Sequence, residues 1–256
     1  MNLMVCIILF SVLLDDILGG MNMSKLVWDQ QGEKQYELGV DHVVLYKKDP
    51  TTKKWMGTAW NGCTSISDSP EGADETELWA DNIKYGSLRS AEKHSGSIEA
   101  YTYPEEWEEC DGMARPVVGL TIGQQKRVPF CLCYRTKIGN DEDSEAGYKL
   151  HIIYNATASP SEKSYETVND SPDAITFSWD YETTPVAVTG YKPTACIVID
   201  STDFTTDDQK NHLKDLEDQL YGTDDVEQEG GTTTPGTAAE LPMPDKVISI
   251  ITNGKS

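Results

Sequence analysis

Segments in which apolar and polar residues alternate dominate this sequence. Such alternation is typical of a β-strand with one buried face, because successive side chains of a strand point to opposite sides. The clearest pair is residues 128–136 and 148–154, which flank the turn-like segment "IGNDEDSEAG" and predict a hairpin. The same pattern predicts further strands at residues 40–46, 54–60, 97–103, 174–181, 194–200 and 246–252.

Helical patterns are scarce. In residues 205–222, Thr206 and Gln209 have the spacing of a capping box, and Gly222 follows the last turn. The segment "YPEEWEECDG" predicts a short helix, because proline and acidic residues suit a first helical turn. The longer helix is amphipathic and should pack against a sheet through the leucines on one face, Leu213, Leu216 and Leu220.

Seven or more strands with one or two helices predict a mainly β protein. The expected architecture is a β-sandwich or barrel with a flanking α-helix and one short helix. A chain of 256 residues is long enough for one large β domain or two small ones, and we expect a single domain over residues 23–256. Within it, the Thr-, Gly- and acid-rich residues 224–240 predict a flexible insertion.

The charge balance is strongly acidic. Asp and Glu number 43 against 21 Lys and Arg, which gives a net charge of −22. Such a charge argues against wrapping DNA or binding an anionic membrane, since both require clustered basic residues. It is compatible with a surface past which DNA slides without sticking.

The first residues have an unusual composition. Residues 3–14 form an apolar run that no basic residue precedes and that two aspartates follow. The run is shorter than the ~20 residues that a helix needs to span a bilayer. We expect residues 1–22 to be an upstream extension or a disordered leader, with translation starting at Met21 or Met23. The alternative is a signal peptide.

No catalytic or metal-binding pattern stands out. The four histidines, at positions 42, 94, 151 and 212, share no ligand spacing. Cys131 and Cys133 lie two residues apart on a predicted strand, so both thiols could face one metal, but two further ligands are not recognisable. Five cysteines follow the leader, an odd number that favours reduced thiols. The residues therefore predict no active site and no cofactor.

Several segments resemble a known family. They are "MSKLVWDQQGEKQYELGVDHVVLY", "WNGCTSISDSPEGADETELWADNIKY", "IEAYTYPEEWEECDG" and "TIGQQKRVPFCLCYRTKIGND". In this order they are similar to the major tail protein of long-tailed, non-contractile bacteriophages and prophages. The resemblance covers about residues 23–222 and the closing "LPMPDKVISII". It leaves out the leader and the Thr/Gly/Glu-rich insertion.

The resemblance implies a structural virion protein rather than an enzyme. Members of this family fold as a β-sandwich with a flanking helix and assemble as hexameric rings. The rings stack into a tail tube around the tape-measure protein, between tail terminator and distal tail proteins. Genomic DNA later leaves through the lumen without specific binding. The protein would be made in the bacterial host cytoplasm and would function in the virion tail, with no membrane.

A long loop between early strands reaches the adjacent ring in this family. Residues 60–88 contain six acids and Lys84 as the single base, and residues 61–81 match that loop by position and length. Its acids could meet a lysine-rich hairpin tip of a neighbouring copy, and charge reversal of all four lysines should impair tube assembly. The subunit-contact candidates are Asp68, Glu71, Asp74, Glu75, Glu77, Lys47, Lys48, Lys53 and Lys54.

Two other function classes remain open from the sequence. A secreted or surface-anchored β-sandwich adhesin would require the leader to act as a signal peptide, with cleavage near Gly20. An enzyme that uses a carboxylate pair would require a concave pocket with converging acids of strongly perturbed pKa.

Overall fold

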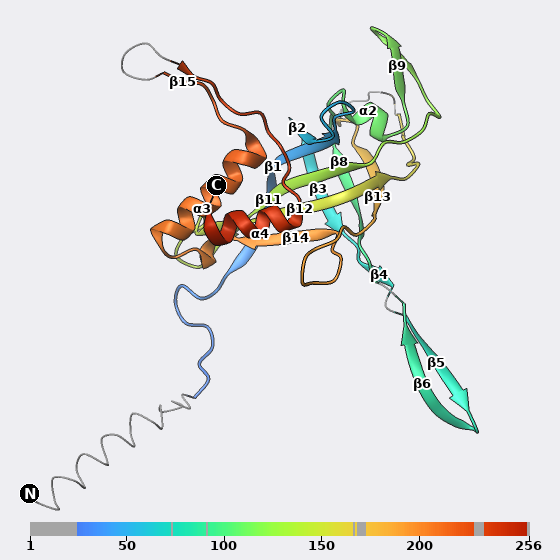
Figure 1. The fold of residues 1–256 in the computed structure, drawn as a ribbon, viewed down its shortest axis with the longest axis vertical. Coiled ribbons are helices and arrows are strands. Elements are labelled where there is room, and N and C mark those ends of the chain that lie inside the picture. Colours follow the sequence, from blue (N-terminus) through green and yellow to red (C-terminus); the bar gives the residue numbers. More distant parts are fainter. Residues whose placement is uncertain are drawn as a thin grey trace, which may run out of the picture.

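The computed structural model describes residues 25–72, 74–90, 92–165, 167, 173–227 and 233–254 (Figure 1). The expectations for residues 1–22 therefore lie outside the described residues. The strands are β1 Tyr36–Lys48, β2 Trp55–Ala59, β3 Cys63–Asp68, β4 Glu71–Gly72, β5 Glu75–Ala80, β6 Ile83–Arg89, β7 Glu92–Lys93, β8 Ser95–Ala100, β9 Ala114–Val117, β10 Leu120–Ile122, β11 Phe130–Gly139, β12 Gly147–Ala158, β13 Phe177–Thr183, β14 Cys196–Asp200, β15 Val226–Glu227 and β16 Thr233–Thr234. The helices are α2 Trp107–Cys110, the 3-10 turn η1 Ser201–Asp203, α3 Asp207–Tyr221 and α4 Pro244–Asn253.

One antiparallel sheet of eight strands forms the body of the protein. Its order is β2-β1-β11-β12-β13-β8-β3, and β14 also pairs with β12. The long strand β12 divides its second edge between two partners: residues 149–153 pair with β14, and residues 156–158 pair with β13. This division lets β13, β8 and β3 turn away from β14 and curl back until β3 approaches β1.

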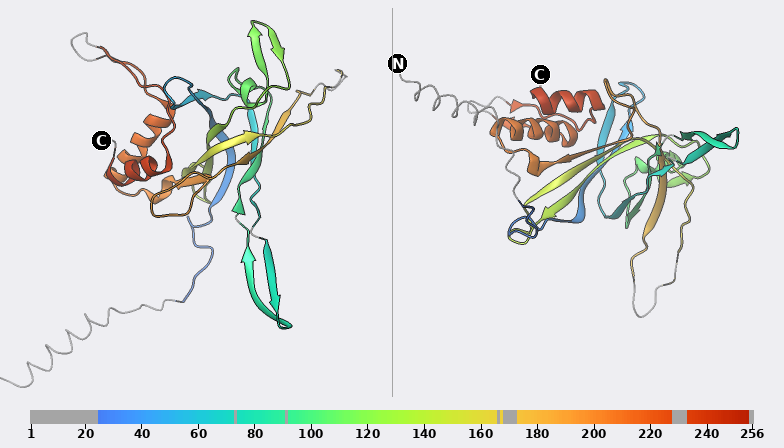
Figure 2. Two further views of the ribbon diagram at one scale, coloured as in Figure 1. Left: turned by 45° about the vertical axis from the view of Figure 1, so that its right-hand side comes forward. Right: turned by 90° about the horizontal axis from the view of Figure 1, so that it is seen from below.

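The central strands are buried on both faces. Along β1, Val43 and Leu45 face the interior of the curled sheet, whereas Val44 and Tyr46 face the helices. Such alternation is a direct result of the two-residue period of a strand. The sheet therefore separates two cores, and the protein is a β-sandwich with helices packed on one outer face, as the sequence predicted (Figure 2).

Aromatic side chains fill the interior of the curled sheet. Trp107, on the short predicted helix α2, is fully buried there. Its ring centroid lies 4.7 Å from that of Trp60, 4.8 Å from Phe130 and 5.3 Å from Trp179. One helical turn thus closes the open end of the sandwich by inserting its largest side chain.

Helices α3 and α4 cover the other face of the sheet. The capping box of Thr206 and Gln209 is present, and the three predicted leucines of α3 are buried. Two tyrosines of the sheet tie the layers together, because Tyr46 Oη donates to the Leu220 carbonyl at 2.6 Å and Tyr154 Oη donates to the Pro242 carbonyl at 3.1 Å.

The prediction of the last strand was wrong. Residues 246–252 belong to helix α4, which begins at Pro244 and buries Val247 and Ile250. These residues are spaced as a helix requires, and proline suits a first helical turn. The apolar run is short enough to fit either period, and the packing against α3 selects the helix.

One loop prediction also needs correction, while the other seven predicted strands and the short helix are confirmed. Residues 61–81 are not one long loop, because they contain strand β3 and the first arm of a hairpin, β5. The predicted flexible insertion 224–240 has paired arms, β15 and β16, next to a bridge between Thr223 and Thr237. Its residues 228–232 lie outside the described residues.

Replacement of Trp107 tests the role of α2. We expect Trp107→Ala to lower the free energy of unfolding by about 3–5 kcal/mol, the usual cost of removing a buried tryptophan. Trp28→Ala is the matched control, because Trp28 is 72% exposed, and its effect should be below about 0.5 kcal/mol. Chemical denaturation of both variants measures the difference. Equal stabilities would contradict the packing role of Trp107.

Candidate functional site

The hairpin of β5 and β6 projects away from the body of the protein (Figures 1 and 2). Its strands pair only with each other among the described residues. Asp81 and Asn82 form the turn, with φ of 51° and 63°. Two successive residues of positive φ are typical of the two-residue turn that joins right-twisted strands, and Asp and Asn accept this conformation more readily than most residues.

One face of this hairpin is charged. The pairing register places Glu75 and Glu77 of β5 on the same face as Lys84 of β6. Lys84 Nζ lies 3.2 Å from a Glu75 oxygen and 2.7 Å from a Glu77 oxygen. Trp79 Nε1 donates to Glu77 at 3.1 Å on this face. Glu75 and Glu77 are therefore already ion-paired with Lys84 of the same copy.

The opposite face of the hairpin is aliphatic and exposed. The register places Thr76, Leu78 and Ala80 of β5 opposite Leu88, Gly86 and Ile83 of β6. The three large side chains, Leu78, Ile83 and Leu88, are 40–64% exposed. A lone two-stranded hairpin is marginally stable in water, and its apolar face gains stability only when another surface covers it.

A second hairpin, β9 with β10, has the same character. Its turn contains Gly119 at φ 81°, the conformation that the third residue of a type II turn requires. Leu120 pairs with Val117, and Ile122 lies two residues after Leu120 on the same strand, so these three side chains share one face. They are 47–58% exposed. Neither hairpin finds a cover for its apolar face within the described chain.

The structure places the five candidate acids in different surroundings. Glu75 and Glu77 lie on the hairpin, and Asp74 lies at its base, where its backbone N–H donates to Ser90 Oγ. Glu71 pairs with Lys93 in the short ladder of β4 and β7. Asp68, at the end of β3, lies in the body of the protein with its side chain 38% exposed. Glu71, Asp74, Glu75 and Glu77 therefore belong to the segment that projects from the body, residues 71–93. Asp68 belongs to the body.

Asp68 accepts hydrogen bonds inside the chain. Tyr134 Oη and Tyr181 Oη each donate to its carboxylate at 3.1 Å, and His94 Nε2 lies 3.5 Å away. Burial by itself raises the pKa of Asp68, but the interaction with His94 and the hydrogen bonds from Tyr181 and Tyr134 together outweigh it, so the pKa is lowered. The same carboxylate, together with Cys196, raises the pKa of His94 to about 10.

The four candidate lysines lie around the turn between β1 and β2, and two of them have ion-pair partners in the chain. Lys47 pairs with Glu109 at 3.1 Å, and Lys54 pairs with Glu240 at 2.7 Å. Lys48 Nζ lies 5.7 Å from the ring centroid of Trp55, and Lys53 Nζ donates to the Pro50 carbonyl. The lysines available to a partner are therefore Lys48 and Lys53.

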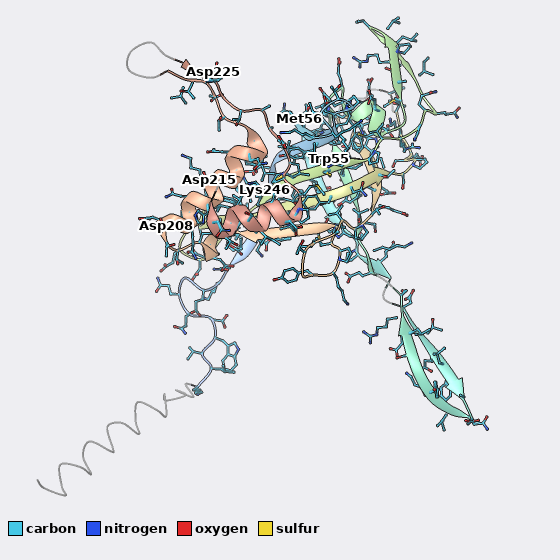
Figure 3. All side chains as sticks on the ribbon, in the orientation of Figure 1. Trp55, Met56, Asp208, Asp215, Asp225 and Lys246 are labelled. Carbon is cyan, nitrogen blue, oxygen red and sulfur yellow. The ribbon has the colours of Figure 1, made fainter. Side chains whose placement is uncertain are left out.

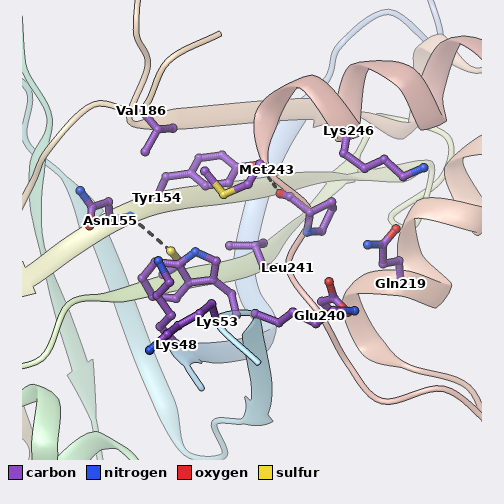
Figure 4. A pocket seen from close by; sticks show the side chains of 14 residues that line it. Lys48, Lys53, Tyr154, Asn155, Val186, Gln219, Glu240, Leu241, Met243 and Lys246 are labelled. Atoms are coloured by element: carbon purple, nitrogen blue, oxygen red, sulfur yellow. Dashed lines mark hydrogen bonds and ion pairs between the residues drawn. The ribbon is translucent and has the colours of Figure 1, made fainter. Parts of the chain in front are cut away.

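A recess of about 640 Å³ lies beside this turn, between β12 and the start of α4 (Figure 4). Lys48, Lys53, Lys54 and Lys246 line it with a single carboxylate, Glu240. Trp55, Tyr154, Leu241 and Met243 form its apolar walls. In a chain of net charge −22 this recess is locally basic. Its lining contains no pair of converging acids.

The cysteine pair of β11 lies in the core under the helices, and Cys131 also lines the recess. Burial raises the pKa of both Cys131 and Cys133 to about 12, which keeps the thiols protonated at neutral pH. Cys131 Sγ accepts the backbone N–H of Asn155 at 3.2 Å. Within the described ranges, no group of three or more His, Cys, Asp or Glu side chains could hold a metal ion. None of the described helices is long and apolar enough to cross a membrane.

Comparisons with known proteins do not assign this chain to a family. No family model matches the chain, and no curated protein matches it. A solved structure described as the cryo-EM structure of the anti-feeding prophage baseplate, 6-fold symmetrised, aligns with 69% of this chain and 97% of its own. The identity is 9% and the TM-score is 0.30. The function must therefore be argued from the chain's own surfaces.

The acidic segment was predicted from the sequence, whereas its aliphatic face and the whole of the β9–β10 hairpin were not. A usable signal was present in "ETELWADNIKYGSLR", where Glu75 and Glu77 alternate with Thr76 and Leu78 before the turn residues Asp-Asn. The segment "ARPVVGLTI" carried a weaker signal, a glycine within an apolar run.

The ion pair of Asp68 and His94 makes stability depend on pH. Folding raises the pKa of His94 to about 10 from about 6.5 in an unfolded chain. The stabilisation is therefore complete below about pH 6.5 and declines as the pH rises toward 10. We expect Asp68→Asn to be less stable than the wild-type protein at pH 6, with a difference that shrinks by pH 10, in urea denaturation.

Asp173→Asn is the matched control, because Asp173 is exposed and the same charge is removed. Its effect on stability should be small and nearly constant over the same pH range. A stability difference between Asp68→Asn and the wild-type protein that stays constant from pH 6 to pH 10 would contradict the ion pair.

Proposed function

We propose that this protein is a structural subunit of a phage tail tube, assembling as rings that stack head to tail. The observation that carries the proposal is the pair of hairpins with uncovered aliphatic faces, which project from opposite ends of the long axis of the protein (Figure 1). A surface at one end that fits a surface at the other produces open, repeating assemblies of identical copies. The resemblance of the sequence to major tail proteins points the same way.

The edges of the sheet support joining of copies within a ring. In the described chain, β3 pairs only with β8 and β14 pairs only with β12, so each leaves one edge open. The outer edge of β2 is covered instead, because Gly57 N–H donates to the Ala239 carbonyl and Leu241 N–H donates to the Trp55 carbonyl. Open edges are a hazard for a monomer, and closing the sheet around a ring removes them.

The charge of the protein suits a conduit for DNA. A tube built from copies that each carry −22 would repel a polyanion over most of its wall and would not retard it by binding. The proposed partners are other copies of the chain, the tape-measure protein, and the terminator and distal tail proteins. No catalytic role is proposed.

Electron microscopy tests the proposal most directly. We expect the purified full chain, and a version that begins at Met23, to form rings or hollow tubes in negative stain, with masses that are multiples of the subunit in mass photometry. A chain that remains monomeric when the tape-measure and distal tail proteins are supplied would contradict the proposal. Export with cleavage near Gly20 would favour the adhesin.

The lysines of the β1–β2 turn give a second test. We propose that Lys48 and Lys53 meet acids of the β5–β6 arm of the next ring. Lys48→Glu with Lys53→Glu should lower tube yield at least tenfold and leave the subunit folded, since both residues are exposed. The wild-type tubes should also weaken as salt increases, because salt screens exposed charges.

The matched control for this pair is Lys192→Glu with Lys214→Glu. These exposed lysines lie on other surfaces and change the net charge by the same amount. Counting tubes in electron micrographs compares the two variants. An equal loss of tubes from both would show that net charge, and not this contact, controls assembly.

A further inference from the structure

We propose that the aliphatic face of the β5–β6 hairpin of one copy packs against the aliphatic face of the β9–β10 hairpin of the next copy. This inference rests on the proposed function and names the surface that receives the projecting arm. This apolar contact would form in addition to the proposed contact of the β5–β6 arm with Lys48 and Lys53.

The two faces match in chemistry and in shape. One presents Leu78, Ile83 and Leu88, and the other presents Val117, Leu120 and Ile122, all of them 40–64% exposed. Each face belongs to a two-stranded ladder, so each is a shallow, ridged surface of similar width. Branched aliphatic side chains on two such ladders interdigitate as they do between the sheets of a sandwich. Mutual burial removes both faces from water.

Charge favours this pairing over pairing of like hairpins. Residues 74–89 carry four acids and two bases, whereas residues 113–127 carry three bases and no acid. Two β5–β6 arms brought together would place their acids near one another. The β9–β10 hairpin presents no carboxylate of its own, and its Arg115 is held at the base by Glu105 and Glu108.

The position of the hairpins makes the contact intermolecular. They extend in opposite directions along the long axis, one beyond each end of the body (Figures 1 and 2). Trp55 and Lys246, which line the basic recess, lie in the body away from the β5–β6 arm (Figure 3). A single copy therefore cannot bring its own arm to either surface. Successive copies can, each supplying one hairpin of each kind.

The size of the contact predicts how assembly proceeds. From the dimensions of short strands, each face covers roughly 200 Å², compared with about 800 Å² per partner in a stable interface. One hairpin contact is therefore too small to hold two free copies together. When two rings meet, several such contacts form at once, and each contact raises the effective concentration of the others, so the total affinity is much higher than that of one contact. Rings should accordingly form before they stack.

Cysteine cross-linking tests which surfaces meet. Ile83→Cys and Leu120→Cys are placed together in the full chain, and assembled tubes are treated with a mild oxidant. We expect a ladder of covalent oligomers that extends beyond the hexamer, because every copy then links to the next. Each single variant should give dimers at most. Because it keeps the native cysteines, it also measures any cross-linking through them.

Ile83→Cys with Tyr191→Cys is the matched control, because Tyr191 is exposed but lies in the loop between β13 and β14. It should give no ladder. Tubes of the first pair that yield no ladder would overturn the inference, and so would an equal ladder from the control pair.

A charge exchange provides a second measurement that does not depend on disulfide geometry. Ile83→Asp or Leu120→Asp alone should leave rings but reduce tubes at least tenfold, with thermal unfolding of the subunit unchanged. Ile83→Asp combined with Leu120→Lys should restore tubes. Tubes at the wild-type yield from Leu120→Asp, or no rescue by the combined variant, would overturn the inference.

The outcomes separate this inference from the function on which it rests. If the wild-type chain forms neither rings nor tubes with its partners supplied, the proposed function fails and this contact fails with it. If the wild-type chain forms tubes but the two hairpins neither cross-link nor rescue each other, only the contact proposed here is wrong.

Discussion

Burial of the β1–β11–β12 ladder on both faces is the constraint on which the rest of the structure depends. Leu132 of β11 points into the aromatic interior of the curled sheet, and its neighbour Cys133 points under helices α3 and α4. Residues 130–134 of β11 are accordingly all apolar, because neither face of this stretch meets water. Strand β12 then divides its second edge between β13 and β14, and this division gives the sheet room to curl around Trp107.

The two projecting hairpins stand outside this doubly buried body. The interior of the sandwich is filled by its own aromatic rings, and the outer face is filled by the helices. Among the residues that the structure describes, nothing covers the aliphatic faces of β5–β6 and β9–β10. The core is filled, but each of the two hairpins carries an uncovered apolar face. Identical copies can bury these faces against one another, which suits the protein to a repeating assembly.

The location of the candidate site was predictable from the sequence, but the partners of its charged side chains were not. The acid-rich stretch after β3 is visible in the sequence, and it forms the projecting arm. The acids of this arm are partly neutralised, since Lys84 forms ion pairs with Glu75 and Glu77. At the β1–β2 turn, Lys54 is likewise paired with Glu240. Asp68 reads like its acidic neighbours, yet Tyr134 and Tyr181 bind it from strands far away in the chain. No local pattern specifies such partners.

The sequence by itself determined the elements whose signal is local. Period-two alternation predicted seven strands, the spacing of Thr206 and Gln209 predicted the start of α3, and the composition determined the charge. Tertiary structure alone decided that residues 246–252 are helical, because a short apolar run fits both periods until packing against α3 selects one. It also decided that the two aliphatic hairpins point in opposite directions. The β5–β6 hairpin precedes strand β8 and the β9–β10 hairpin follows it, so they leave from its two ends. The place of β8 in the sheet is set by pairing with β13, a strand far away in the chain, and such pairing leaves no trace within either segment.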